Sequence, residues 1–187
     1  MKDRIAISRL KQGDLNGLET LVSRYQAQAV HAAYLIVYDR SLAEDVAQMA
    51  FVKVAERIHQ FDDGRPFAPW FFRIVVNDAL KLARKRKRDT SLEEELDKPT
   101  AQLAKWLADP DPQPEQWVEQ QETRQIILKA IASLPPGQRA VIVMRYYLDM
   151  SMGDMSTETG RPLSTIKWWL RDARKRLRGL LGTLQDR

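Results

Sequence analysis

The chain has 187 residues, 44% of them hydrophobic, which is enough to bury a core as one large domain or two small ones. Thirty Lys and Arg residues against 25 Asp and Glu residues give a net charge of +5, which favours an anionic partner. The absence of cysteine excludes disulfides, thiolate nucleophiles and zinc-cysteine clusters, and it is consistent with a reducing compartment.

Neither a membrane span nor a usual catalytic motif is apparent. No apolar stretch approaches the roughly 20 residues that cross a bilayer, and the first ten residues are charged where a secretory signal is apolar. We therefore expect a cytoplasmic protein without membrane insertion. HExxH, GxSxG and P-loop patterns do not occur. His59 lies near Asp62 and Asp63, but a second histidine at ligand spacing is missing, so we expect no metal and no cofactor.

Two amphipathic helices are predicted in the first 60 residues. Apolar residues recur at steps of three and four from Asp14, a suitable N-terminal cap, to Ile36. The pattern resumes at Ser41, which forms a predicted capping box with Glu44, and continues to Gln60.

A third helix is expected after a turn rich in Pro, Gly and Asp at residues 61–69. It begins at Trp70 and ends in a basic block, Lys81 to Arg88. Aromatic rings beside cations suit single-stranded nucleic acid, because unstacked bases stack on the rings while the cations hold the backbone. Alternatively, Trp70 and Phe71 belong to the core and the basic block is a solvated helix end, which this segment alone favours.

The charge changes sign after the basic block. Residues 89–122 contain ten acidic residues against two lysines, and prolines interrupt most of this stretch. A short helical segment is expected around Trp106. The predicted units are a first domain at 1–88, an acidic linker at 89–114 and a second domain at 115–187.

The second domain is predicted to contain a helix-turn-helix. After a helix from Trp117, Pro136 restarts a helix at a favoured first-turn position. Ser151 then caps a short helix, Gly160 supplies a left-handed turn, and the last helix begins near Leu163. Its exposed positions are strongly basic, which favours DNA binding over a solvated helix of an ordinary bundle. The basic residues are Arg161, Lys167, Arg171, Arg174, Lys175, Arg176 and Arg178. No strand pattern occurs, so the expected fold class is all-α.

Several motifs in this order resemble those of the extracytoplasmic-function (ECF) sigma factors of bacterial RNA polymerase. The matching residues are Gly13-Asp14 with Leu21 and Tyr25, Ala43-Glu44-Asp45-Val46-Ala47-Gln48 followed by Phe51, the run from Phe67 to Asn77, Leu134-Pro135-Pro136-Gly137-Gln138-Arg139, and Thr165-Ile166-Lys167 leading to Ala173-Arg174. The resemblance covers nearly the whole chain.

The resemblance implies two helical domains that act without covalent chemistry. The first would dock on core polymerase and melt the −10 promoter element, and the second would read the −35 element. The implied polymerase contacts are Asp45, Gln48 and Phe51. The implied −10 contacts are Phe67, Trp70, Arg73, Asn77, Lys81, Arg84 and Lys85. The implied −35 contacts are Arg161, Ser164, Thr165, Lys167, Arg171, Arg174 and Lys175.

The implied partners are core RNA polymerase, promoter DNA and an anti-sigma protein, with the acidic linker directed toward the RNA exit path. The chain departs from the family pattern at Met49, where Glu is usual, and at Trp168, Trp169 and Asp172 of the recognition helix. We expect one tryptophan to pack against the first helix of the motif and the other to contact DNA.

Two other functions remain open. A stand-alone helix-turn-helix regulator would bind duplex DNA without polymerase and would not need the aromatic and basic segment. An enzyme acting on nucleic acid would need a catalytic cluster, which the sequence does not offer.

Overall fold

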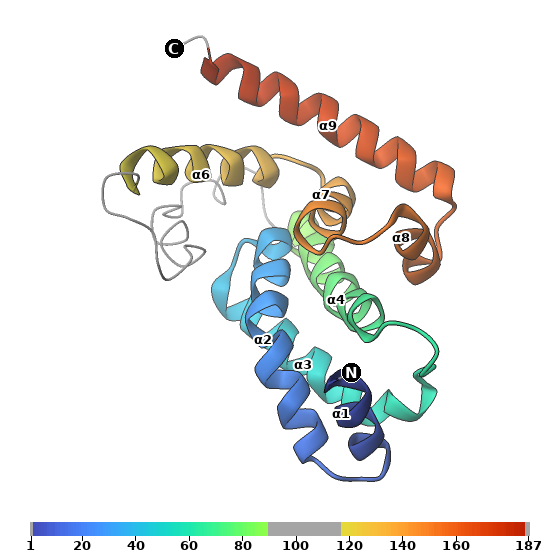
Figure 1. The fold of residues 1–187 in the computed structure, drawn as a ribbon. Helices are drawn as coiled ribbons and strands as arrows, with labels where there is room; N and C mark the ends of the chain where they lie inside the picture. The colour runs from blue at the N-terminus through green and yellow to red at the C-terminus, as the bar shows by residue number, and fades with distance from the viewer. Residues whose placement is uncertain (1, 90–116, 186–187) are drawn as a thin grey trace.

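The computed structural model describes residues 2–89 and 117–185, and all regular secondary structure in these ranges is helical (Figure 1). The N-terminal domain contains α1 (Lys2–Lys11), α2 (Asn16–Val37), α3 (Arg40–Arg57), the 3-10 turn η1 (Ile58–Gln60) and α4 (Phe67–Asp89). The C-terminal domain contains α6 (Trp117–Ala132), α7 (Pro136–Ile142), the π-helical turn η3 (Val143–Tyr147), α8 (Met152–Thr159) and α9 (Leu163–Gln185). The short helical segment predicted near Trp106 lies outside the described residues.

The core of the N-terminal domain lies where α2, α3 and α4 pack together, with α1 against α2 (Figure 1). Leu21 and Ile36 of α2 and Phe71 of α4 are fully buried. Tyr25 of α2 lies within 6 Å of the rings of Phe67 and Phe71. The apolar stripes read from the sequence therefore meet in one core, as their helical spacing predicts.

The start of α3 differs from the prediction. Asp39, in an extended conformation, caps the helix by accepting a hydrogen bond from the Leu42 N–H at 3.1 Å. Ser41 lies inside the helix, and Glu44 pairs with Arg40 at 2.9 Å instead of forming a capping box. The sequence pattern was ambiguous because both Asp and Ser are good caps and they stand two residues apart.

The N-terminal helix α1 was not predicted, because its charged residues hide a short apolar stripe. Ile7 and Leu10 are buried. A Cβ atom on Gly17 of α2 would clash with the Ala6 carbonyl oxygen, so the close contact of α1 with α2 requires glycine there. Leu15 stands at the N-cap position of α2, and the predicted cap Asp14, one residue earlier, accepts a hydrogen bond from the Asn16 N–H at 2.9 Å.

The helix-turn-helix boundaries agree with the prediction. Pro136 opens α7 in its first turn. The Ser151 hydroxyl caps α8 by accepting a hydrogen bond from the Asp154 N–H at 3.0 Å. Gly160 has φ +64°, the left-handed conformation that ends α8 and lets α9 begin at Leu163.

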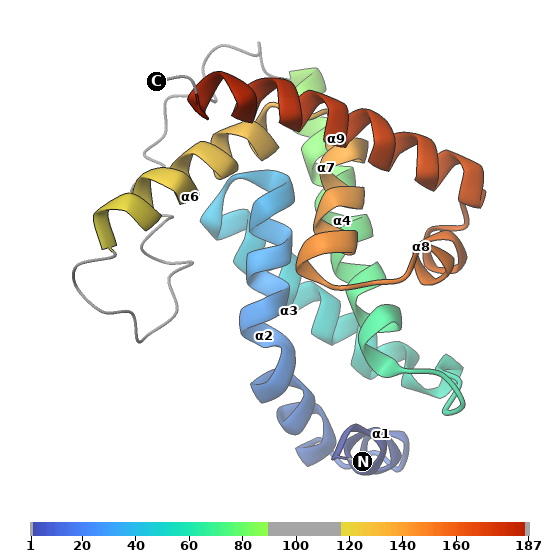
Figure 2. The same ribbon diagram turned by 45° about the horizontal axis from the view of Figure 1, so that its top comes forward.

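The two domains pack directly on each other. Helices α7 and α8 contact α4, and α6 and α7 contact α2. Both views place these helices next to one another (Figure 2). The Tyr38 hydroxyl donates to the Leu128 carbonyl at 2.7 Å, and burial raises the pKa of that hydroxyl, so it remains a donor. Arg139 donates to the Ile36 carbonyl at 2.6 Å and lies over the Tyr38 ring. Within the described residues, no helix is both long enough and apolar enough to cross a membrane.

Candidate nucleic-acid and polymerase interfaces

Helix α9 presents one buried face and one basic face. Ile166, Leu170 and Ala173 are buried against the rest of the domain, which includes α7 and α8. The opposite side is exposed over the first four turns. The exposed residues are Ser164, Lys167, Trp168, Arg171, Arg174, Lys175, Arg176 and Arg178. This geometry is that of a recognition helix whose outer face is free to enter a DNA groove.

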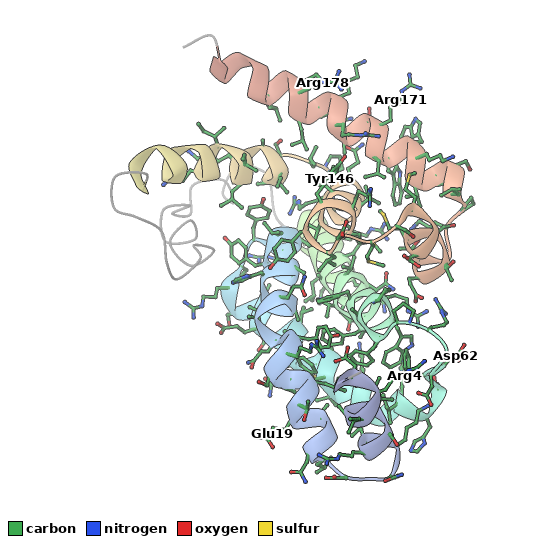
Figure 3. All side chains as sticks on the ribbon, in the orientation of Figure 1. Arg4, Glu19, Asp62, Tyr146, Arg171 and Arg178 are labelled. Carbon is green, nitrogen blue, oxygen red and sulfur yellow. The ribbon has the colours of Figure 1, made fainter. Side chains whose placement is uncertain are left out.

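The cations of α9 differ in what they already contact. Arg176 pairs with Asp172 at 3.2 Å, and Arg174 donates to the Leu170 carbonyl at 3.2 Å along its own helix. Within the described part of the chain, Lys167 and Arg171 have no carboxylate within 4 Å. Arg171 and Arg178 project from the outer side of α9, away from the body of the molecule (Figure 3). Their charges are therefore presented to solvent, as phosphate or base contact requires.

The structure explains why an acidic residue, Asp172, stands on the basic helix α9. The Asp172 carboxylate accepts a hydrogen bond from Gln138 Nε2 of α7 at 2.5 Å, and Gln138 is buried. Asp172 thus faces the domain interior and positions α9 on α7. Its negative charge is shared with Arg176 and does not interrupt the exposed basic face.

The two tryptophans have opposite environments. The Trp169 ring lies 4.7 Å from the Arg161 guanidinium, and it is packed beside Gly137 of α7. Trp168 is 59% exposed on the basic face. Trp169 therefore contacts α7 and the turn between α8 and α9, and it lines one cavity together with Thr159 of α8. Trp168 is the one available to DNA.

The aromatic residues at the start of α4 belong to the hydrophobic core of the N-terminal domain. Phe67 and Trp70 are 4% and 9% exposed, and each ring lies within 6 Å of Phe61. This burial favours the packing interpretation of the aromatic run over base stacking. The helix also begins at Phe67, three residues before the predicted start, because Phe67 is part of the same cluster.

The polar residues of α4 lie farther along the helix and face the C-terminal domain. Lys81 and Arg84 are exposed, Asn77 is half-buried, and all three line a cavity of about 190 Å³. The other wall of this cavity includes Arg161 and Trp169. Arg73 is half-buried, Lys85 is exposed, and the remaining predicted −35 residue, Thr165, is half-buried in the first turn of α9.

A second, larger hollow of about 870 Å³ lies between α2 and α3. Gln48 and Phe51 line it, and Asp45 is exposed nearby on α3 without lining it. Phe51 is only 6% exposed, with its ring 4.7 Å from Phe71, so it forms the floor of the groove and part of the core. Met49, beside the groove, is 51% exposed.

The acidic turn before α4 has structural roles. Asp62 Oδ1 accepts a hydrogen bond from the Gly64 N–H at 2.9 Å, and Asp63 pairs with Lys11 of α1 at 2.9 Å. Among the described residues, no three His, Cys, Asp or Glu side chains gather as they would around a metal ion.

Sequence reasoning missed one charged group between the domains. Glu158 of α8 is 3% exposed, and it pairs with Arg65 and with Arg73 of the N-terminal domain. The burial of Glu158 could not be predicted from its place in an amphipathic helix, because its partners stand 85 or more residues away in sequence.

Comparisons with known proteins agree with this architecture. The profile of the family "Sigma-70 region 2" matches residues 21–89, and that of "Sigma-70, region 4" matches residues 124–177. The ECF RNA polymerase sigma factor RpoE of Cereibacter sphaeroides is 33% identical over 139 residues, covering 74% of this chain and 71% of that protein. The ECF RNA polymerase sigma factor SigW of Bacillus subtilis is 29% identical over 180 residues, covering 95% of this chain and 96% of that protein.

A solved structure has the same fold. CnrH in complex with the cytosolic domain of CnrY superposes with a TM-score of 0.70 at 24% identity, covering 98% of this chain and 99% of CnrH. The two family regions occur in the same order as the two domains, and the second contains the basic helix-turn-helix. The chain therefore belongs to the ECF RNA polymerase sigma factors, the subunits that give bacterial RNA polymerase its promoter specificity.

Proposed function

We propose that this chain directs transcription initiation by docking on core RNA polymerase through its N-terminal domain and reading the −35 element through α9. The observation that carries the proposal is the exposed basic face of α9 on a helix-turn-helix, joined to a second domain with its own cation-bearing helix, α4. A promoter-specificity subunit needs both surfaces, because it must bind duplex and melted DNA at once. Its work is binding and positioning, with no covalent step, and it takes place in the cytoplasm with the polymerase.

At the −35 element, the first turns of α9 would enter the major groove. Lys167, Trp168 and Arg171 lie near the N-terminal end, where side chains reach base edges. Arg178 lies late in the helix and is suited to a phosphate contact. Ser164, Thr165, Arg161, Arg174 and Lys175 complete the surface.

At the −10 element, the polar side of α4 would hold the melted strand. Asn77 can hydrogen-bond to a base edge, and Lys81, Arg84 and Lys85 can neutralise phosphates. Because Phe67 and Trp70 are core residues, we assign base recognition to the polar groups and a supporting role to the aromatic cluster.

Core polymerase would dock at the groove between α2 and α3. Gln48 offers an amide at the groove edge, Phe51 an apolar floor, and Asp45 an exposed charge beside it. We also infer that an anti-sigma protein regulates the chain, because relatives of this fold have been solved with such partners: RpoE of Bartonella quintana was solved with the anti-sigma factor NepR.

A pull-down with core RNA polymerase distinguishes this function from that of a stand-alone DNA-binding regulator. The parent chain should retain core polymerase, and Asp45→Arg should weaken retention several-fold, because the change reverses a charge at the rim of the docking surface. Asp149→Asn, an exposed change on the other domain, is the control. Failure of the parent chain to bind core polymerase would favour the stand-alone regulator.

A further inference from the structure

The contact between the two domains contains a buried carboxylate. Glu158 lies in the last turn of α8, and its side chain is 1% exposed. One carboxylate oxygen pairs with Arg65, in the turn before α4, and the other lies 3.5 Å from an Arg73 nitrogen on α4. A buried carboxylate is costly unless cations compensate it, so the two arginines stabilise α8 in this position.

One of the two cations that hold Glu158 belongs to the surface assigned to the melted promoter strand. Arg73 is one of the predicted −10 residues, and Asn77, Lys81 and Arg84 follow on the same side of α4, in the cavity closed by α7, Arg161 and Trp169. A carboxylate and a phosphate bind a guanidinium through the same charge-assisted hydrogen bonds. Glu158 Oε2 lies 3.5 Å from an Arg73 nitrogen as an ion pair without a hydrogen bond, and it therefore competes with a DNA phosphate for the charge of Arg73.

The rest of the domain contact is of a different kind. Its hydrogen bonds lie between α2 and the segment from α6 to η3, where Tyr38, Arg139 and His31 bond to the opposite domain. None of these groups belongs to a predicted DNA surface. Helix α7 also packs on α4. Among the described residues, the ion pairs of Glu158 are the ones that join the two domains, and one of them engages a predicted −10 residue, Arg73.

We propose that Glu158 is an internal latch that holds the helix-turn-helix domain over the DNA-binding side of α4, so that the free chain is closed to the −10 strand. The occlusion part of this proposal rests on the proposed function, whereas the latch itself does not. Opening the latch leaves the arginines able to hydrate, because their side chains are already 45% and 39% exposed in the closed form. Binding of polymerase or DNA can thus replace the latch with other anionic contacts.

The first arm of the test measures the distance between the domains. The chain has no cysteine, so spin labels on Ser8→Cys of α1 and Gly179→Cys of α9 report this distance by double electron–electron resonance. Both positions are exposed, and a Cβ at Gly179 meets nothing within 4 Å. The parent should give a narrow distribution, and Glu158→Gln, which keeps the shape and removes the charge, should broaden it.

The matched control is Asp149→Asn, which removes one negative charge from the same domain. Asp149 has a 99% exposed side chain, pairs only loosely with Arg145 at 3.8 Å, and has a φ of +48° that Asn tolerates. Its distance distribution should equal that of the parent. Arg65→Gln opens the latch from the other domain and should broaden the distribution as Glu158→Gln does, which separates latch loss from a local defect in α8.

The second arm measures binding of the full chain to a fluorescent pool of random single-stranded DNA. Glu158→Gln should bind about tenfold more tightly than the parent, a typical size for coupling between sites. An unchanged distance distribution overturns the latch, and a broadened distribution without tighter DNA binding overturns the occlusion. Run-off transcription by core polymerase with the parent chain is measured in a separate experiment. A lack of transcripts there would contradict the proposed function but would not contradict the latch.

Discussion

Arg171 and Arg178 leave α9 in the same general direction but at different distances from its N-terminus (Figure 3). Arg171 lies in the half that reaches base edges, so Arg171→Ala should cost about 1–3 kcal/mol in promoter binding and relax the preference at one or two −35 positions. Arg178→Ala should weaken binding to all sequences alike and lower the salt slope by about one unit. The measurement is promoter activity over a randomised −35 element.

If Arg171→Ala changes the promoter strength but leaves the preferred sequence intact, Arg171 only positions the helix. Arg178→Ala is the matched control, because it removes the same charge from the same helix.

Trp168 is the residue on which the −35 preference of this chain should most visibly depend. Its indole is exposed among cations, and an apolar ring in the major groove recognises the thymine methyl group. Trp168→Ala should therefore lose a preference for thymine at one −35 position, at a cost of about 1–3 kcal/mol at that site. Selection from a randomised −35 library measures it.

Trp169→Ala is the comparison variant for this prediction, since it loses the packing beside Gly137 and Arg161. It should lower the stability of the domain without changing the preferred bases. An unaltered preference in Trp168→Ala, or an equal change in both variants, would show that the indole of Trp168 does not read sequence.

At the scale of elements, the start of α3 gives a test of local structure. Asp39→Ala removes the cap on the Leu42 N–H and the 3.3 Å contact with Arg86 of α4, and should cost about 0.5–2 kcal/mol in the free energy of unfolding. Ser41→Ala should be nearly neutral, because Ser41 is inside the helix. Urea titration of both variants checks this. Greater destabilisation by Ser41→Ala would support the capping box expected from the sequence.

Most helices could be predicted from the sequence, because the residues that begin and end them stand at the helix ends themselves. Ser151 and Gly160 stand at the ends of one short helix, and Pro136 at the start of another, so nothing distant was needed to place them. Helix α1 could not be predicted, because its burial depends on Gly17, which follows it and lets two backbones approach.

The sequence predicts which residues of the candidate site lie on the exposed face of a helix, but it does not predict which side chains contact one another. Helical period correctly separated Lys167 and Arg171 from Ile166 and Leu170. The same period places Trp169, three residues after Ile166, at the edge of the buried stripe and Trp168 on the opposite face, so it also contained the distinction between the two tryptophans. The pairing of Asp172 with Gln138 depends on how α7 packs on α9, which no local pattern contains.

At the scale of the whole molecule, the contact of the two domains should depend on pH through His31. Its ring lies 3.1 Å from the Tyr147 hydroxyl, and burial lowers the pKa of the imidazole. The folded chain therefore binds fewer protons than the unfolded chain just below the ordinary histidine pKa, so this group stabilises the fold less as the pH falls from 7 to 5. The stability of His31→Gln should change less over that range.

Urea unfolding of parent and His31→Gln at several pH values measures this difference, and carboxylate titration cancels between the two chains. An identical pH dependence in both would show that the His31 proton is not coupled to folding. The contact itself could not be read from the sequence, because it joins residues 116 positions apart.

As a sigma factor, the chain should supply promoter specificity to core RNA polymerase. The most direct test is run-off transcription with core polymerase on a library of genomic fragments, with and without the chain. We expect discrete transcripts that require the chain and that start downstream of a shared −35 and −10 pair. Binding of the chain to duplex DNA without any such transcripts would contradict this expectation and would identify a stand-alone regulator instead.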